Sequence, residues 1–209
     1  MRKGNWSMTE HDGAATLIER VKNILLKPEQ EWERIDAEQT TIGNIYRRHV
    51  LPLAAVPTVA GLIGSLAFGY SALGFSYRPS VGAALASAVV QYGLALTGVF
   101  VLALIIDALA PSFQATPDRT RAFKVAAYSA TASWVAGIFN ILPTLSVLGI
   151  LGLYSLYLLY RGLPKLMRAS ADKALSYTIV VIIAAIGVAL VVGAIVAPIS
   201  AMLMHGFWK

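Results

Sequence analysis

The chain has 209 residues, of which 57% are hydrophobic and only 13% are charged, and its formal net charge at pH 7 is +6. This composition excludes an ordinary cytosolic enzyme, because too few polar side chains are present to cover a water-soluble globule. It also excludes a disordered chain, a collagen and a disulfide-stapled domain, since apolar content is high and cysteine is absent. We therefore expect an all-α integral membrane protein.

Residues 1–49 form an N-terminal segment that we expect on the cytoplasmic side. Apolar periodicity predicts an amphipathic helix over 13–26, and Pro28 can begin a second helix over 28–37. The apolar stripe is a candidate docking face for a cytoplasmic protein, made of Leu17, Ile18, Val21, Ile24, Leu25 and Trp32. We rank first the alternative that this stripe packs against the protein's own loops or lies in the membrane interface. Eight basic and eight acidic residues balance in this segment, which argues against a purely electrostatic lipid anchor.

The membrane domain, residues 50–209, contains four long stretches without Lys, Arg, Asp or Glu. Each stretch can cross a bilayer, since about 20 apolar helical residues span a ~30 Å hydrocarbon core. The stretch at 125–160 has 36 residues, too many for one span, and Pro143 after Asn140 predicts a break within it. We therefore predict a five-transmembrane-helix bundle, with spans over 51–73, 82–109, 122–140, 143–160 and 175–203.

The basic residues predict the orientation of these spans. With five crossings, 15 of the 17 Lys and Arg residues fall on one side, and Arg78 and Lys209 fall on the other. Since Lys and Arg accumulate in cytoplasmic loops, we expect the N-terminus in the cytoplasm and the C-terminus outside. Four crossings would instead put the basic clusters at 119–124 and 161–173 in opposite compartments. Charged residues stand where the apolar core of a signal peptide would be, so we expect the first span to act as the insertion signal.

Patterns that carry catalysis are missing from the sequence. The three histidines, His11, His49 and His205, share no helix turn, so the spacing of metal ligands is absent. There is no Gly-rich phosphate loop before a helix, and no Ser–His–Asp grouping confined to one side of the bilayer. We expect no enzyme, no metal, no cofactor and no nucleic-acid partner, and a lipid-modifying enzyme would need clustered acids that the sequence does not place together.

Several polar and aromatic positions within the spans are candidates for function. Asp107 is an acidic residue at the edge of the apolar zone, and we rank a structural ion pair with the basic residues at 119–124 above a proton relay. The tyrosines at 154, 157 and 160 recur every three residues along one side of the fourth span, where they could line a polar path, bind a head group or donate to a neighbouring backbone. Besides Asp107, the candidate functional positions are Gln91, Tyr128, Asn140, Tyr154, Tyr157 and Tyr160.

Three stretches carry a resemblance to a known family: LLKPEQEWERI (25–35), AFKVAAYSATASW (122–134) and LGLYSLYLLYRGLPKLM (151–167). In these stretches the chain resembles the bacterial branch of the Yip domain family, multi-pass proteins named for their interaction with Rab/Ypt GTPases in eukaryotes. The resemblance implies a five-helix bundle in the bacterial inner membrane with a cytoplasmic N-terminus, and it implies no catalytic residue. The family often has a proline shortly after the Ala-Tyr-Ser of the third span, where this chain has 130–133 without one.

Two functions of different classes remain. The first is a non-enzymatic protein that organises the membrane or scaffolds a partner, and the second is a small transporter, channel or lipid-translocating protein. A dry, glycine-packed centre with an exposed apolar face on 13–37 would favour the first. A continuous groove containing Asp107, Gln91 or Tyr157 would favour the second. We expect membrane lipids as partners in either case, and an oligomer stays open.

Overall fold

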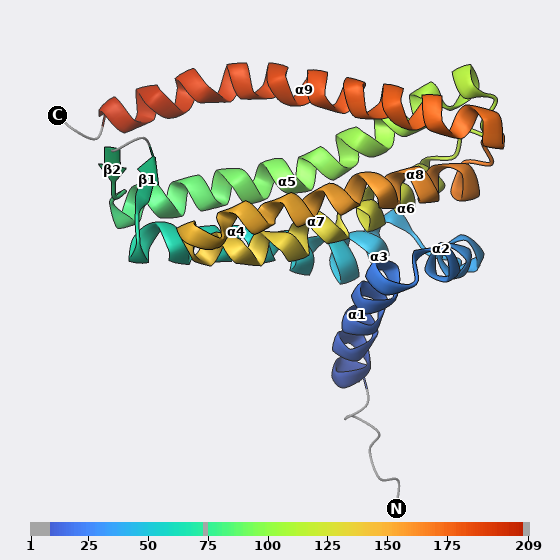
Figure 1. The fold of residues 1–209 in the computed structure, drawn as a ribbon, viewed down its shortest axis with the longest axis horizontal. Coiled ribbons are helices and arrows are strands. Elements are labelled where there is room, and N and C mark those ends of the chain that lie inside the picture. The colour runs from blue at the N-terminus through green and yellow to red at the C-terminus, as the bar shows by residue number, and fades with distance from the viewer. Residues whose placement is uncertain (1–8, 73–74, 207–209) are drawn as a thin grey trace, which may run out of the picture.

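Helices account for nearly all of the described chain, which comprises residues 9–72 and 75–206 of the computed structural model, with side chains over 17–69, 77–142, 144–145 and 147–194. Helix α1 (Thr9–Leu26) projects sideways from the bundle, and α2 (Pro28–Ala37) lies near one end of it (Figure 1). Pro28 occupies the first turn of α2, where its missing N–H breaks no helical hydrogen bond. The two N-terminal helices are thus separated by Lys27 alone.

A short helix and a π-helical turn lead into the bundle. Helix α3 (Ile42–Ile45) begins at Thr41, whose hydroxyl accepts a hydrogen bond from the backbone N–H of Asn44 at 3.3 Å. The π-helical turn η1 (Tyr46–Val50) then continues directly into α4 (Leu51–Ala67). The chain from α3 to α4 is therefore one continuous helical path.

The first predicted span, drawn to residue 73, ends earlier than expected. Gly69 adopts a left-handed backbone conformation with φ of 72°, which favours glycine and stops α4 after Ala67. The chain then forms an antiparallel hairpin, β1 (Tyr70–Ala72) with β2 (Phe75–Tyr77), at the end of the bundle opposite α2 (Figure 1). The hairpin passes so near that a Cβ atom on Gly69 would lie 2.8 Å from the carbonyl oxygen of Tyr77.

Helix α5 (Val81–Leu109) returns along the bundle over the second predicted span, 82–109. Its N-terminus is capped by Ser80, whose hydroxyl accepts a hydrogen bond from the N–H of Ala83 at 3.2 Å. The 3₁₀ turn η2 (Ala110–Phe113) ends it, and Gln114 follows with a positive φ of 55°.

The third predicted span, 122–140, is a broken helical path of three pieces. These are α6 (Arg119–Ser129), α7 (Thr131–Ala136) and the 3₁₀ helix η3 (Gly137–Ile141). Residues 122–129 are all buried, so α6 forms the centre of the bundle. Its alanines permit this position because small side chains let neighbouring helices approach closely.

The segment predicted as the fourth span, 143–160, differs from the prediction in its helix type and in the residue at which it ends. It starts as a 3₁₀ helix, η4 (Pro143–Leu153), and continues as α8 (Tyr154–Leu166), six residues beyond the predicted end. Arg168, with φ of 56°, turns the chain into α9 (Ala171–Gly206), which contains the predicted span 175–203. Tyr177 of α9 donates a hydrogen bond to the carbonyl of Ile106 and so fastens α9 to α5.

In the described part of the chain, four helical segments are long and apolar enough to cross a membrane. They are Ile42–Ala67, Val81–Phe113, Val147–Leu166 and Ala171–Ala194. The broken path of α6, α7 and η3 is not among them, so the fifth crossing stays a prediction. The protein is a helical membrane protein, and its described residues include one short hairpin.

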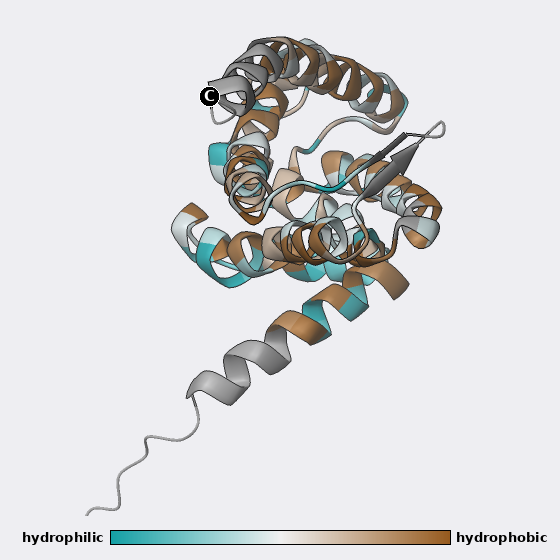
Figure 2. Ribbon diagram, turned by 90° about the vertical axis from the view of Figure 1, so that its left-hand side faces the viewer, coloured by the Kyte–Doolittle hydropathy of each residue, from teal (hydrophilic) through white to brown (hydrophobic). Residues whose placement is uncertain are grey.

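The tightest packing lies at the end of the bundle that carries α2. The large side chains that are fully buried there include Trp32, Ile35, Phe123, Leu158, Leu163 and Tyr177. Away from that end the helices present apolar side chains outward: Val89, Val147 and Leu190 are 72%, 73% and 69% exposed. Viewed along its length the bundle is largely hydrophobic, and α1 leaves it on one side (Figure 2). An apolar outer surface of this kind suits a lipid environment.

Candidate functional site

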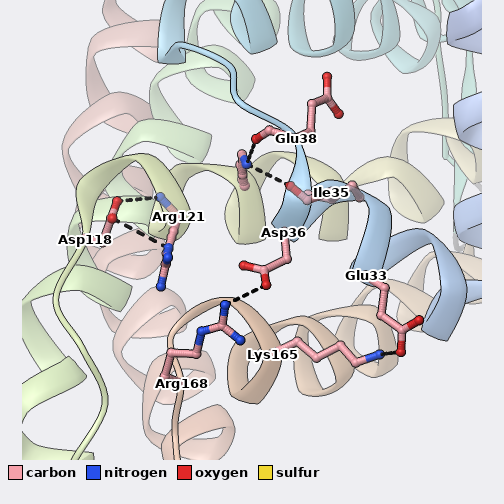
Figure 3. Close-up of polar contacts among 9 residues, drawn as sticks. Glu33, Ile35, Asp36, Glu38, Asp118, Arg121, Lys165 and Arg168 are labelled. Carbon is pink, nitrogen blue, oxygen red and sulfur yellow. Dashed lines mark hydrogen bonds and ion pairs between the residues drawn. The ribbon is translucent and has the colours of Figure 1, made fainter.

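Helix α2 is joined to α8 and the turn after it by three ion pairs that follow one another in the same order on both segments. The pairs are Glu29 with Arg161, Glu33 with Lys165 and Asp36 with Arg168. On each segment the spacing is four residues and then three, which puts the three acids on one face of α2 and puts Arg161 and Lys165 one turn apart on α8, while Arg168 follows in the turn after that helix. Glu33 faces Lys165 at 2.5 Å and Asp36 faces Arg168 at 2.7 Å (Figure 3). Because such partly exposed pairs each contribute at most about 1 kcal/mol, their main effect is to fix the register of α2.

Trp32 is the apolar anchor of α2. Its side chain is 0% exposed and lies against Gly162 of α8, where an added Cβ atom would come 2.7 Å from the indole Cζ2. The ring also meets Tyr128 of α6 edge-on, with ring centroids 6.5 Å apart. Trp32 therefore requires glycine at position 162 in order to reach the centre of the bundle.

Lys124 of α6 holds the C-terminal end of α2. Its Nζ donates hydrogen bonds to the carbonyl oxygens of Ile35, at 2.7 Å, and Glu38, at 2.6 Å (Figure 3). Carbonyls in the last turn of a helix have no partner within the helix, and the dipole of the helix favours a cation there. A lysine that is only 5% exposed thus satisfies both the backbone of α2 and its own charge.

Arg20 connects α1 to the same cluster. Its guanidinium lies 3.2 Å from Glu31 and 2.7 Å from Glu38, and its Cζ stands 5.4 Å from the centroid of the Tyr128 ring. Burial alone would lower the pKa of Arg20, but Tyr128, Glu38 and Glu31 raise that pKa above its ordinary value. Arg20 is therefore a permanent positive charge between α1, α2 and α6.

His49 joins the start of the first bundle helix to α7. His49 Nε2 and Thr131 Oγ1 form a buried hydrogen bond of 2.9 Å, and the imidazole lies 4.4 Å from the Tyr128 ring, centroid to centroid. Thr131 is fully buried and His49 is 3% exposed. This pair is a structural connection between elements that are 82 residues apart in the chain.

Two cavities open near the N-terminal helices. One, of about 230 Å³, lies between α2, the end of α8 and the start of α9, and Trp32, Tyr160, Arg161 and Lys165 contribute to its wall. The other, of about 170 Å³, lies beside α1 and is lined by charged and aromatic side chains that include Arg20, Arg48, His49 and Tyr128. The described residues contain no group of three or more His, Asp or Glu side chains placed to hold a metal ion.

Three of the predicted candidates lie at or near this cluster. Tyr128 is 4% exposed and contacts Trp32, His49 and Arg20. The hydroxyl of Tyr154 donates to the carbonyl of Leu25 at 3.1 Å, which ties α8 to the end of α1. Tyr160 lines the larger cavity.

The other candidates do not come together. Asp107 Oδ2 lies 3.8 Å from Arg119 Nε, the kind of ion pair that the sequence favoured, while Oδ1 is buried without a hydrogen-bond partner among the described residues. Gln91, Asn140 and Tyr157 are exposed on three different elements. These residues line no common groove in the described structure.

Most of the candidate docking face on α1 and α2 is covered by the protein itself. Ile24 and Trp32 are 0% exposed, and Leu17, Val21 and Leu25 are half-buried against the protein's own core. These side chains are covered because α2 folds back onto α6 and α8. Of the predicted face, only Ile18, which is 70% exposed, stays open to a partner, and Leu26 beside it is 69% exposed.

Sequence reasoning missed the residues that hold the cluster together. Arg20, Lys124, Gly162 and the pairing of His49 with Thr131 gave no sign of their roles in the sequence. The shared spacing of the acids on α2 and the bases on α8 was a usable signal. The structure brings the stretches 25–35, 122–134 and 151–167, on which the family resemblance rests, into one contiguous site.

Most of the residues that form this site lie in the part of the chain that matches a known domain. Residues 22–194 match the Yip1 domain. The inner membrane protein YohC of Escherichia coli strain K12 is 30% identical over 127 residues, which are 60% of this chain and 65% of that protein. The protein of the same name from Escherichia coli O6:H1, strain CFT073, matches to the same extent. The match thus covers just under two thirds of these relatives, and no solved structure matches the chain.

Proposed function

Because this chain belongs to the Yip1 domain family, we propose that it is a non-enzymatic inner-membrane protein that scaffolds a cytoplasmic partner or organises the membrane. Its relatives in Escherichia coli are inner membrane proteins, and its own helices are long and apolar enough to cross a bilayer. The partner or leaflet contact is assigned to helix α1, and the bundle supplies the anchor.

The observation that carries this proposal is a contrast between two sets of residues on α1, one attached to the bundle and the other exposed. Arg20 and Ile24 fasten α1 to the buried cluster, while Ile18 and Leu26 on the same helix are 70% and 69% exposed. Exposed large apolar residues on a helix that leaves the bundle are costly in water unless something covers them. A protein that holds such a helix in a fixed direction is suited to presenting it.

The proposal includes five crossings with a cytoplasmic N-terminus. Supporting this, η3 packs so closely on α4 that a Cβ atom on Gly64 would clash with the backbone carbonyls of Asn140 and Ile141. The path of α6, α7 and η3 therefore runs alongside a candidate span. The basic residues of α6 and α8 lie at the same end as α2, and Arg78 lies at the hairpin end, which is the distribution expected for a cytoplasmic α2.

Site-specific photo-crosslinking in living cells tests the scaffolding role. A photoreactive amino acid at position 18 or 26 should give one discrete protein adduct or, if α1 lies on the leaflet, lipid adducts. The matched control is position 22 on the same helix, where the exposed Lys22 should give neither. Equal labelling at 18, 22 and 26 would contradict a specific contact through the apolar positions.

A transporter or channel is the competing function, and the placement of its candidate residues weighs against it. Gln91 and Tyr157 are exposed on separate elements, and Asp107 faces Arg119. A flux and lipid-scrambling assay in liposomes separates the two functions. Transport that is lost in Asp107→Asn, with no specific adduct at position 18, would reverse our choice.

A further inference from the structure

We propose that the cavity between α2, α8 and α9 binds the phosphate group of an anionic phospholipid, and that the acids of α2 compete with this phosphate for Arg161 and Lys165. The inference goes beyond the scaffolding role and does not depend on it. It rests on the position of the cavity, on the donors in its wall and on the exposure of the competing acids.

The cavity lies where one candidate membrane span ends and the next one begins. Tyr160, Arg161 and Lys165 come from the last turns of the segment Val147–Leu166, and Ala171 and Ala174 from the first turn of Ala171–Ala194. The ends of membrane-spanning helices lie at the level of lipid head groups. A lipid phosphate can therefore reach the cavity from the bilayer while its acyl chains stay in the hydrocarbon core.

The donors in the wall suit a phosphate. Arg161 offers a planar fork of N–H groups, and Lys165 offers a mobile point charge, the two side-chain types that proteins use for phosphate recognition. Trp32 of α2 contributes to the opposite wall, with a side chain that is 0% exposed. The two cations of α8 are therefore the groups that would bind the phosphate.

Two acids of α2 now pair with the cations that a phosphate would bind: Glu29, which lines the cavity, and Glu33, which lies outside its lining. Glu29 pairs with Arg161 and Glu33 with Lys165, yet the two acidic side chains are 62% and 69% exposed. Exposed acids hold their partners weakly, because water competes for both members of the pair. Trp32 and Lys124 anchor α2 independently of these acids, so the two carboxylates can turn into water without releasing the helix.

The test measures lipid binding to the purified full-length protein in detergent, with native mass spectrometry as the readout. Phosphatidylglycerol is the anionic probe, phosphatidylcholine is the zwitterionic control, and inorganic phosphate and glycerol phosphate are the soluble competitors. We expect preferential retention of phosphatidylglycerol, and no displacement by the soluble competitors at equal concentration. Displacement of the lipid by inorganic phosphate at equal concentration would assign the cavity to a soluble phosphate and overturn the lipid assignment.

Two matched pairs of variants locate the site. Glu33→Gln should tighten phosphatidylglycerol binding about five-fold, since it removes a competing pair, whereas Glu19→Gln removes an exposed acid of α1 and should leave the affinity unchanged. Lys165→Gln should weaken binding about tenfold, and Lys22→Gln should not.

Equal effects within either pair would reduce the result to net charge and overturn the proposal. Glu33→Gln keeps both cations of the cavity, so it tests the competition even if Lys165→Gln does not fold. Crosslinking at position 18 should persist in all four variants, which separates failure of this site from failure of the scaffolding role.

Discussion

The indole of Trp32 lies against Gly162 so closely that a Cβ atom at that position would require the ring or one of the two helices to shift. This contact joins α2 to α8 across 130 residues of sequence, and it fixes where the apolar face of α2 ends up. Among the described side chains of the N-terminal segment, the large apolar ones that stay exposed are thereby reduced to Ile18 and Leu26 of α1. The stability of the site and the direction of α1 thus depend on one glycine.

Gly162→Ala should loosen α2. The added methyl group would lie within 3 Å of three atoms of the Trp32 ring, and overpacking of this kind costs about 1–3 kcal/mol. We expect a lower free energy of unfolding in detergent and faster hydrogen exchange over residues 28–37. Gly187→Ala is the control, because a Cβ atom there meets nothing within 4 Å. Equal losses in the two variants would show that position 162 is not special.

Lys124→Met should release the C-terminal end of α2. The methionine can fill the space of the lysine stem, but it leaves the carbonyls of Ile35 and Glu38 without their donor, at a cost of about 1–3 kcal/mol. Hydrogen exchange should rise at residues 35–38 more than at the start of α2. Lys22→Met, at an exposed position on α1, is the control and should change neither exchange nor stability.

Charge reversal tests the register of α2 on α8. Lys165→Glu places two acids together and should destabilise the docked α2 by less than about 1 kcal/mol, and the further change Glu33→Lys should restore it. The loss should shrink at high salt, because exposed charges are screened. Hydrogen exchange of α2 measures both effects. If α2 exchanges as fast in the double variant as in Lys165→Glu alone, the ion pair does not contribute to the docking of α2.

Thr131→Val should leave the buried imidazole of His49 without its hydrogen-bond partner. The cost is about 1–3 kcal/mol, because both residues are almost fully shielded from solvent. Thr97→Val is the matched control, since Thr97 is exposed and its hydroxyl donates only to Gly93 in its own helix. Thermal unfolding in detergent, followed by circular dichroism, compares the two.

Cysteine labelling in intact cells tests the crossings, and the chain offers a background without cysteine. With five crossings, Thr116→Cys and Asp172→Cys should both be protected from an impermeant thiol reagent, and Tyr77→Cys should react. With four crossings, positions 116 and 172 would lie in opposite compartments. Reaction at only one of these two positions would therefore contradict the predicted topology.

The sequence predicted the elements whose signal is local. Uncharged runs of sufficient length located α5 and α9, and the proline at 28 located the start of α2. The hairpin at 70–77 was missed because it lies inside an uncharged run, where hydropathy does not distinguish a strand from a helix. The 3₁₀ geometry of 143–153 was missed for the same reason, since its apolar content equals that of an α-helical span.

The site itself depends on contacts that periodicity does not encode. Lys124 lies 89 residues from Ile35 and would be placed at the membrane surface by its charge alone, yet it is buried because α2 folds over it. Arg20 belongs by sequence to an exposed helix face, and only the fold brings Glu31, Glu38 and Tyr128 around it. Local patterns described each helix face separately, and the pairing of those faces appeared only in three dimensions.

The arrangement of α2 on α8 admits a single alignment. If α2 slid by one helical turn toward the start of α8, Glu33 would meet Arg161, but Trp32 would leave the notch at Gly162 and Glu29 would face Tyr157, which carries no charge. A shift in the opposite direction would move Asp36 beyond Arg168, the last cation of the three ion pairs, and leave it without that partner. The contact of Trp32 with Gly162 and the three ion pairs therefore fix the same alignment of α2 on α8. This alignment determines where α1 leaves the bundle.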